Sequence, residues 1–450
     1  MSQRNLEEIA AGAVELARRC GAGEAECTVS EGDEFSAVVR MRELETLKEA
    51  GSRGAGLRVL IGRRSGSAYT SDLTADGLRQ MVEQAIAIAG ITMEDPCADL
   101  PEPGELGAVD GDLRLYSDDV AALSTGEKIR QARQAEEAAL AADARIANSE
   151  GGGFSSYVNL RAFANSRGFT GSYRTSSCSL SVVPVARDGE SMERDYWYSA
   201  ARSASGLEKP EDVGRIAAER ALRRLHARKV PTAKVPVIFE PRTARSLIEN
   251  LFDAVSGDAV YRKASFLTGR LGQRIASENV TIVDDATIPG LFGTSPFDDE
   301  GVPSRRTVVV ERGVLRNYLL NSYTARKLGL RTTGNASRGL GGSPGVGHGN
   351  LYLEKGAGRP EEIRRQVRRG FYVTELLGAG VNTVTGDYSR GAAGLWIEDG
   401  EFAFPVSEVT IASNLREMLM GIEAVGTDLE FRASTAAPTL LIGEMTVSGR

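Results

Sequence analysis

Alternation of polar and apolar residues, spread over both halves of the chain, restricts its fold more than any other feature. Residues 25–69 contain FSAVVRM and GLRVLIG between glycines, and residues 146–205 combine the same alternation with many Gly, Ser and Tyr residues. Successive side chains of a strand point to opposite faces, so this pattern predicts half-buried antiparallel strands. We therefore predict a meander with short turns over 25–69 and several neighbouring strands over 146–205.

Helical periodicity separates these predicted strands. Apolar residues recur three and four positions apart over 1–21 and 72–90, and an alanine-rich stretch with interspersed Lys and Glu covers 124–144. The same criterion predicts a helix over 209–228. The Pro- and Asp-rich residues 94–112 lack both periodicities, which indicates a surface loop.

The C-terminal half is richer in predicted strands. KVPTAKVPVIFEP indicates a linker that leads into a buried strand, and strand character recurs in SENVTIVDD, RTVVVERGVLRNYLL, NLYLEKG, GLWIEDGEFAFPVSEVTI and APTLLIGEMTVSG. A chain of 450 residues has room for two or three domains. We predict an α+β fold of two domains, with a helix-and-antiparallel-sheet domain over 1–230 and a β-rich domain over 231–450.

The charge of the chain argues against nucleic acid as a partner. The net charge is −7 at pH 7, which disfavours binding of a phosphate backbone by bulk electrostatics. The run from Arg215 to Arg228 holds five arginines. These could form a local basic patch, but they also fit the polar face of an amphipathic helix. We favour the solvated helix face and expect no direct contact with nucleic acid.

The sequence predicts neither membrane insertion nor export. No window holds about 18 apolar residues without a charge, and residues 1–21 lack the uninterrupted apolar run of a signal peptide. The cysteines, which include no C-x-x-C pair, are Cys20, Cys27, Cys97 and Cys178. We therefore expect reduced thiols, no membrane association and a cytoplasmic location.

Candidate metal ligands are scarce. The chain has two histidines, His226 and His348, which lie far apart in the sequence. A hydrolytic zinc site usually takes three protein ligands, and neither histidine has a second ligand at helical spacing. A metal site that uses both histidines stays open as an alternative that we disfavour.

One predicted helix carries two carboxylates on the same side. It begins after Pro241 and ends at Gly257, and Glu249 and Asp253 lie four positions apart within it. Paired carboxylates can serve in acid–base chemistry or bind a hard cation. We favour the plainer interpretation, a solvated or capping face. Serine-nucleophile chemistry finds no support, because the chain has no G-x-S-x-G motif.

Three other segments have a structural interpretation beside a functional one. The glycine-rich residues 334–350 lack the order of a phosphate-binding loop, and we predict a mobile surface loop. PFDDEG at 296–301 lacks EF-hand spacing, so we predict a tight turn. Residues 386–401 have small side chains before an aromatic strand. Such a strand suits either close sheet packing, which we favour, or pairing with an added peptide strand.

Three long segments resemble the TldD/PmbA family, also known as modulators of DNA gyrase. They are DDEGVPSRRTVVVERGVLRNYLLNSYTARKLGLRTTGNA (298–336), VTGDYSRGAAGLWIEDGEFAFPVSEVTIASNL (384–415) and PTLLIGEMTVSG (438–449). Their length and fixed internal spacing make this resemblance more specific than any short motif. It implies a two-domain α+β fold, in agreement with the prediction from periodicity.

The resemblance also locates a zinc motif that this chain has lost. In TldD-type members, the helix that corresponds to 241–257 carries His-Glu-x-x-x-His. The matching positions here hold Ile248, Glu249 and Asp253, and the tail GTDLEFRASTAAPTLLIG has no Cys to complete the site. The chain therefore resembles the PmbA branch, also called TldE, and we expect no catalytic residue, no metal and no other cofactor in it. Glu249 and Asp253 are then vestigial.

The PmbA branch implies a non-catalytic subunit in a heterodimer. We expect a TldD-like subunit as partner, zinc in that partner, and a cytoplasmic metalloprotease complex that acts on unfolded or leader peptides. We also expect a large dimer interface and one wall of a shared peptide groove. Two alternatives stay open: a peptidase in its own right, with a metal held by Glu249, Asp253 and a distant ligand, and a homodimeric binding or regulatory protein.

Overall fold

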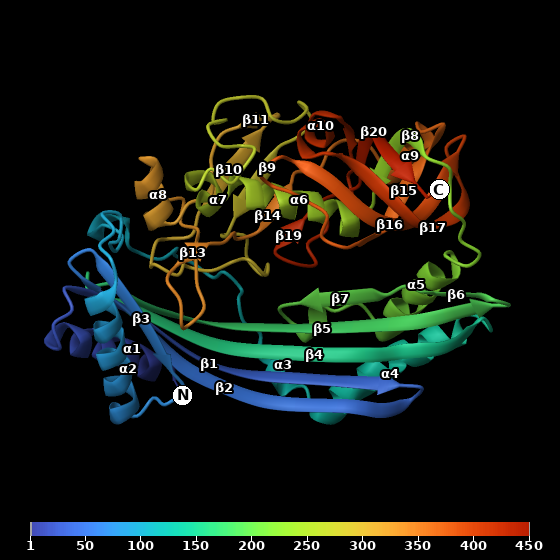
Figure 1. Cartoon of the computed structure of the whole chain (residues 1–450). Helices are drawn as coiled ribbons and strands as arrows, with labels where there is room; N and C mark the ends of the chain where they lie inside the picture. Colours follow the sequence, from blue (N-terminus) through green and yellow to red (C-terminus); the bar gives the residue numbers. More distant parts are fainter. Residues whose placement is uncertain (1, 450) are drawn as a thin grey trace.

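The computed structural model describes residues 2–449 and has the α+β class expected from the sequence. Figure 1 shows a long curved sheet from the N-terminal half and a β-rich C-terminal half above it. The N-terminal meander and the four predicted helices are confirmed, and α3 is an additional short helix. In chain order the elements are α1 (Gln3–Arg19), β1 (Glu24–Arg40), β2 (Glu43–Ile61), β3 (Arg64–Thr70), α2 (Ala75–Ile91), α3 (Asp118–Ala122), α4 (Thr125–Ala141), β4 (Ile146–Asn165), β5 (Thr170–Asp188), β6 (Ser191–Arg194), β7 (Trp197–Ala201) and α5 (Pro210–Leu222).

The curved sheet has one apolar face and one polar face. Its strand order is β3-β2-β1-β4-β5-β6, and β7 pairs with β5. Side chains such as Leu180 pack against α4 and α5, while α1 and α2 cover the other end of the same face. Because side chains alternate along a strand, Ser155, Tyr157 and Arg161 of β4 point to the opposite face. Arg161 Nη2 lies 2.7 Å from Asp299 Oδ1 of the C-terminal half, so this polar face looks toward that half.

The C-terminal half is built from short strands and a few helices. β15, which pairs in parallel with β8, is absent from the segments with predicted strand character. The division of the chain at residue 230 stays a prediction. The elements are β8 (Ala233–Phe239), α6 (Pro241–Val255), α7 (Gly257–Tyr261), β9 (Ile282–Asp285), β10 (Arg306–Glu311), β11 (Val314–Leu315), α8 (Ser322–Leu328), β12 (Ala336–Ser337), β13 (Gly345–Val346), β14 (Leu351–Leu353), α9 (Pro360–Arg365), β15 (Arg369–Leu377), β16 (Asp387–Glu398), β17 (Glu401–Asn414), α10 (Leu415–Met420), β18 (Ile422–Val425), β19 (Thr435–Ala436) and β20 (Leu440–Ser448).

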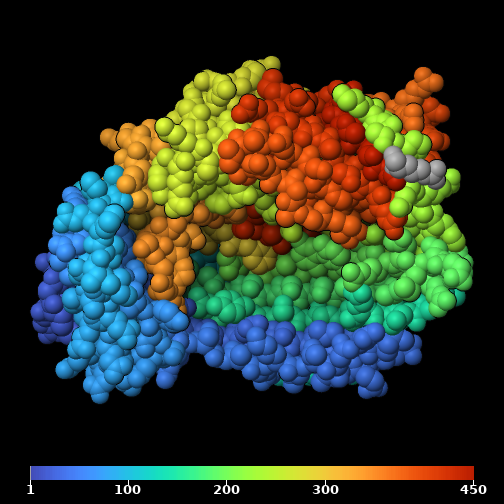
Figure 2. Space-filling model, viewed as in Figure 1, coloured from blue at the N-terminus to red at the C-terminus, as the bar shows by residue number. Residues whose placement is uncertain are grey.

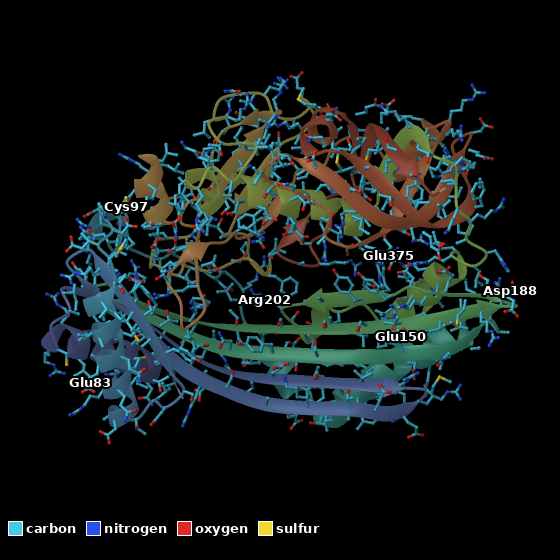
Figure 3. All side chains as sticks on the ribbon, viewed as in Figure 1. Glu83, Cys97, Glu150, Asp188, Arg202 and Glu375 are labelled. Carbon is cyan, nitrogen blue, oxygen red and sulfur yellow. The ribbon has the colours of Figure 1, made fainter. Side chains whose placement is uncertain are left out.

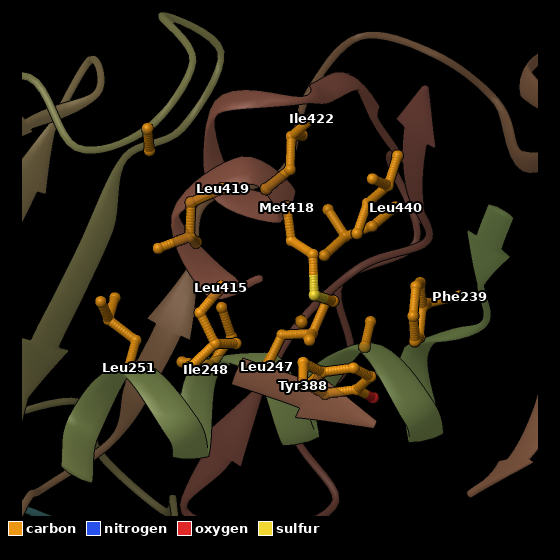
Figure 4. Packing of buried hydrophobic residues seen from close by; sticks show 14 of the residues in the cluster. Phe239, Leu247, Ile248, Leu251, Tyr388, Leu415, Met418, Leu419, Ile422 and Leu440 are labelled. Carbon is orange, nitrogen blue, oxygen red and sulfur yellow. The ribbon is translucent and has the colours of Figure 1, made fainter. Parts of the chain in front are cut away.

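Two sheets enclose the C-terminal core, and α6 packs into it. One sheet has the order β17-β16-β15-β8-β20-β18, and the other has the order β11-β10-β9-β14-β19. The apolar side of α6 contributes Leu247, Ile248 and Leu251, which meet Met418 of α10 and Phe239 of β8 (Figure 4). Burial of large apolar side chains on one helix face fixes which face is left outside. The opposite side of α6 carries Glu249 and Asp253.

The arginines of α5 correct one sequence prediction. A solvated face was expected for the run from Arg215 to Arg228, and Arg215 does form exposed pairs. Arg220, however, is buried, and its Nη2 lies 2.6 Å from Glu240 Oε1. Charged groups in an apolar helix face need partners, and the partner here comes from a segment that periodicity along the helix cannot reveal.

The glycine-rich segment corrects a second prediction. Residues 334–350 were expected to form a mobile surface loop, but the β12–β13 connection reaches down to the curved sheet (Figure 1). Leu340 sits so close to β2 that a Cβ on Gly56 would lie 1.8 Å from its carbonyl oxygen. Arg338 is buried and its Nη1 lies 2.8 Å from Glu26 Oε1. The segment therefore ties the two halves together, and we call the contact of residues 338–340 with β1 and β2 the seam.

Two further predictions are confirmed. PFDDEG forms a tight turn, in which the Asp298 N–H donates to the Val302 carbonyl at 2.8 Å. β16 pairs with β15 on one side and β17 on the other. Both of its edges are occupied, so the small residues of 386–401 serve sheet packing and not strand addition. No helix within residues 2–449 is both long and apolar enough to cross a membrane.

Candidate functional site

The polar face of the curved sheet and the C-terminal half face each other across a recess. Figure 2 shows the surface hollowed there, beside the orange β12–β13 segment. Side chains also connect the halves across it: Arg224 Nη1 lies 2.7 Å from Glu375 Oε2, and Arg202 Nη2 donates to the Phe292 carbonyl at 2.8 Å. Glu375 and Arg202 mark this boundary in Figure 3. The outer face of α6 borders the recess from the C-terminal half.

Ile248, which the family resemblance aligns with the first histidine of the zinc motif, belongs to the core. Its exposed fraction is 2%, and it packs with Leu247 and Leu251 against α10 (Figure 4). A side chain of carbon and hydrogen offers no lone pair to a metal, and zinc takes Cys, His or carboxylate ligands. At this position the helix supplies packing where a metal centre would need a donor.

Glu249 is held only loosely. Its side chain is 49% exposed, and its Oε1 lies 3.9 Å from Arg245 Nε, one turn earlier on α6. Exposed pairs of this kind contribute from nothing to about 1 kcal/mol of stability. The sequence interpretation of a solvated face agrees with this placement.

Asp253 lies near a residue that sequence spacing could not bring to it. The protein around the recess raises the pKa of Asp253, mainly by desolvation, and His348 partly opposes this shift. The His348 ring packs edge-on against Phe252 with ring centres 4.8 Å apart. His348 Nδ1 lies 2.8 Å from the Gly349 carbonyl, and Nε2 lies 3.4 Å from Thr435 Oγ1. In the tautomer that these contacts favour, Nδ1 carries the proton and Nε2 accepts from the hydroxyl.

Asp284 lies in the same neighbourhood as His348. It is buried in β9, and Asn335 Nδ2 donates to its Oδ2 at 2.6 Å. Desolvation raises the pKa of Asp284 to about 6, against the hydrogen bond from Asn335 and the charge of His348. A raised pKa means that the site favours the neutral carboxyl.

The described structure does not assemble a metal site from these groups. Within residues 2–449 no three His, Cys, Asp or Glu side chains lie close enough together to hold a metal ion. His226 is elsewhere, with Nε2 2.9 Å from Asp188 Oδ2 at the end of the β5–β6 hairpin. The two histidines are therefore not brought together, and Glu249 and Asp253 gain no third ligand. The residues present do not fit a zinc ion.

Charged side chains at the seam are deeply buried. Glu26 of β1 is 0% exposed, and it is flanked by Arg58 Nη1 and Arg338 Nη1, each 2.8 Å from its Oε1. Glu300 is buried nearby and accepts from the Ser322 N–H at 2.9 Å. Burial is the main cause of the raised pKa of Glu300, and the negative charge of Glu26 adds to it.

A pocket at the amino end of α6 was not foreseen from the sequence. It is a cavity of about 120 Å³ that lies between β7, α5 and the C-terminal half. Three aromatic side chains and several arginines line it, among them Trp197, Tyr198, Tyr372, Arg220 and Arg245. The signals in the sequence were the arginines of 209–228 and the aromatic residues before them, but nothing local indicated that they meet. We call it the α6 pocket.

Comparison with known proteins identifies relatives along nearly the whole chain. The sequence profiles of the PmbA/TldA metallopeptidase match in three parts: domain 1 over residues 25–89, the central domain over 118–225 and the C-terminal domain over 232–449. Metalloprotease PmbA of Escherichia coli O157:H7 is 40% identical over 446 residues, which cover 99% of this chain and 96% of that protein. The metalloprotease TldD homolog of Haemophilus influenzae is 25% identical over 425 residues, 88% of this chain and 87% of its own.

A solved structure has the same architecture. The putative modulator of DNA gyrase from Bacteroides thetaiotaomicron superposes with a TM-score of 0.91 and is 28% identical in sequence. The match covers 99% of each chain. The arrangement of a curved sheet under a β-rich half is therefore shared over the full length.

Proposed function

Because the chain belongs to the PmbA/TldD metallopeptidase family, we propose that it is the metal-free subunit of a heterodimeric metalloprotease. Its partner is a TldD-like subunit that holds the zinc, and the complex acts on unfolded or leader peptides. The observation that carries the proposal is Ile248, a buried core residue at the position where the zinc motif needs its first histidine. The higher identity to PmbA than to a TldD homolog supports the same branch.

In this proposal, the residues of this chain contribute the shape and the polar groups of a peptide-binding surface. The curved sheet presents hydroxyl groups to the recess, for example Ser155 and Ser179, whose Oγ atoms lie 2.8 Å apart. The outer face of α6, with the half-exposed Glu249, adds a polar surface from the C-terminal half. Such a surface can hold an extended peptide by hydrogen bonds without acting on it. Glu249 has no metal-bound water to activate, because the metal is in the partner.

Zinc content tests the proposal most directly. The chain is purified alone and together with a TldD-type subunit, in buffers free of chelators, and zinc and peptidase activity are measured on each sample. We expect zinc and activity only when the partner is present. Stoichiometric zinc in the isolated chain, lost on Asp253→Asn, would overturn the proposal.

Association is the second test. An obligate interface commonly buries about 2,000 Å² or more, so light scattering should find a stable 1:1 complex at micromolar concentration. A chain that stays monomeric with the partner would contradict the proposal. A chain that pairs only with itself would favour the homodimeric binding protein instead.

A second candidate function, a peptidase in its own right, is favoured by one observation. His348 lies beside Asp253 on the recess side of α6, so one imidazole does reach the helix that lost two. Peptide hydrolysis by the isolated chain, abolished by His348→Ala and insensitive to added partner, is the result that would favour this alternative.

A further inference from the structure

The α6 pocket contains one guanidinium that differs from its neighbours. Arg220 Nη2 lies 2.6 Å from Glu240 Oε1, and Arg432 Nη2 lies 2.6 Å from Glu208 Oε1. Both arginines are thus directly paired with carboxylates. The carboxylate nearest to Arg245 is that of Glu249, at 3.9 Å, and Arg245 is 35% exposed at the pocket.

The buried Nε atoms of two other pocket arginines face carboxylates of the protein. Arg220 is only 7% exposed, and its Nε has no hydrogen-bond partner in the described structure. The buried Nε of Arg242 also makes no hydrogen bond, and it lies 3.7 Å from Glu240 Oε1. Arg220 Nε lies 3.3 Å from Asp195 Oδ2, but without hydrogen-bond geometry. Both Nε atoms therefore have a carboxylate oxygen of the protein within 4 Å, and Arg245 is the pocket arginine whose carboxylate partner is most distant and whose side chain is most exposed.

The amino end of α6 adds to the preference of the pocket for an anion. α6 is 15 residues long, starts at Pro241, and has no side-chain cap at its amino end. The amino end of a helix carries partial positive charge and favours anions. Pro241 and Arg242 line the pocket, so a carboxylate held by Arg245 lies within the first turns of the helix.

The other walls select an apolar or aromatic group. Trp197 and Tyr198 come from β7, Tyr372 comes from β15, Ala436 comes from β19, and Ala437 directly follows β19. Pockets with mostly apolar walls and a few convergent polar groups are typical of small-ligand sites. Here the apolar walls and the guanidinium are adjacent, so the ligand carries an apolar side chain and a carboxylate on neighbouring atoms.

We propose that the α6 pocket binds the carboxyl-terminal residue of a peptide, with its terminal carboxylate on Arg245 and its apolar side chain between the aromatic walls. That the ligand is a peptide rests on the proposed function; the carboxylate and the apolar group rest on the pocket itself. Arg245 and Glu249 are one turn apart on α6. A peptide anchored in this way extends along α6 past Glu249 toward Asp253, across the frame that lost its zinc ligands.

The chain contains its own reporter for this test. It has two tryptophans: Trp197 lines the pocket, and Trp396 is buried in the C-terminal core beside Phe404. In a Trp396→Phe background, tryptophan fluorescence reports the pocket alone. The probes are acetyl-Ala-Ala-Phe as the free acid, the same peptide as its amide, and an amidated peptide with Glu in place of the middle Ala. Calorimetry on the wild-type chain repeats the titration if Trp396→Phe misfolds.

We expect the free acid to bind about tenfold or more tightly than the amide, as a charge-assisted hydrogen bond contributes. Arg245→Gln should abolish that ratio, and Arg245→Lys should keep part of it. Arg316→Gln, which removes an exposed arginine paired with Glu311, is the matched control and should change nothing. Equal binding of acid and amide, or an unchanged ratio in Arg245→Gln, would overturn the inference.

The Glu-containing amide separates two sources of the same chemistry. If it binds as tightly as the free acid, the pocket reads a side-chain carboxylate, and the assignment to a chain end is wrong. All titrations use the isolated chain and no catalysis. Zinc in that chain would therefore overturn the proposed function and still leave the titrations interpretable, while failure of the titrations leaves the zinc result untouched.

Discussion

Two acidic regions border the recess between the halves, and they are built in opposite ways. On α6, the side chain of Glu249 is half exposed, and the cation nearest to it is 3.9 Å away. At the seam, Glu26 is fully buried between two guanidinium groups at 2.8 Å. A solvated carboxylate contributes little to stability, whereas a buried one tolerates no loss of its partners.

Under the proposed function, this difference explains how α6 keeps its fold without zinc ligands. On the outer face of α6, Glu249 makes only a distant ion pair with Arg245, and the inner face, with Ile248, packs the core better with carbon than with a nitrogen ligand. The seam has no such freedom, because Arg58 and Arg338 come from different halves and share one carboxylate. The predictions below test this contrast in order of decreasing expected effect.

The largest effect is expected for Glu26→Gln. The substitution leaves Arg58 and Arg338 buried next to each other without their negative partner, and breaking a buried ion pair in this way costs about 3–5 kcal/mol. The free energy of unfolding from urea titration is the measurement. Glu8→Gln is the matched control, because Glu8 pairs with Arg4 on the exposed surface of α1. A loss for Glu26→Gln no larger than for Glu8→Gln would remove the contrast.

Asp284→Asn should change how stability depends on pH. The folded chain keeps a proton on Asp284 up to a pKa of about 6, above the ordinary value of 3.8. Between these values the unfolded chain has lost a proton that the folded chain retains. The contribution of Asp284 to the free energy of unfolding therefore falls as pH rises through this interval, by about 3 kcal/mol in total.

The Asp284→Asn variant has no carboxyl group to titrate at this position. The difference between its free energy of unfolding and that of the wild type should therefore rise between pH 4 and 7 by a similar amount. Urea titrations at several pH values measure this difference. Asp110→Asn, in an exposed loop, is the control and should give a flat difference. A flat difference for Asp284→Asn as well would show that Asp284 ionises normally in the folded chain.

Gly56→Ala should loosen the seam through its backbone contact. The added Cβ would lie 1.8 Å from the Leu340 carbonyl oxygen, so the β12–β13 segment must shift, at a cost of about 1–3 kcal/mol. Hydrogen exchange at residues 338–342 and urea titration both report it. Gly12→Ala is the control: nothing lies within 4 Å of its added Cβ, and α1 should gain up to about 1 kcal/mol. Unchanged exchange in Gly56→Ala would mean that the segment does not hold the halves.

The smallest effect is expected for Glu249→Gln. Stability should change by less than about 0.5 kcal/mol, and the activity of the complex with a TldD-type partner should stay within a few-fold. Loss of a true general base typically lowers the rate about 10²–10⁴-fold. Peptide hydrolysis and sizing of the reconstituted complex are measured together. A drop of that size in an intact complex would show that this chain takes part in the chemistry.

The sequence alone determined much of the local structure of this protein and the side chains that α6 carries. Alternation predicted the meander of 25–69, and helical periodicity predicted α6 between Pro241 and Gly257, because each depends on side chains within a few positions of one another. The positions that align with the zinc motif also lie within one helix. Ile248 and Asp253 stand where a zinc motif would place imidazoles, and no arrangement of the rest of the chain changes what those two side chains are.

Tertiary structure alone decided which distant groups meet. It placed His348 against Phe252, buried Arg220 of a helix that looked solvated, and turned a glycine-rich segment into a seam through Arg338 and Leu340. Each of these contacts joins residues on separate elements. Ion pairs and close backbone contacts depend on distances of a few ångströms in space. Periodicity describes only residues that are near one another along the chain. The seam and the α6 pocket therefore have no signature in any local pattern.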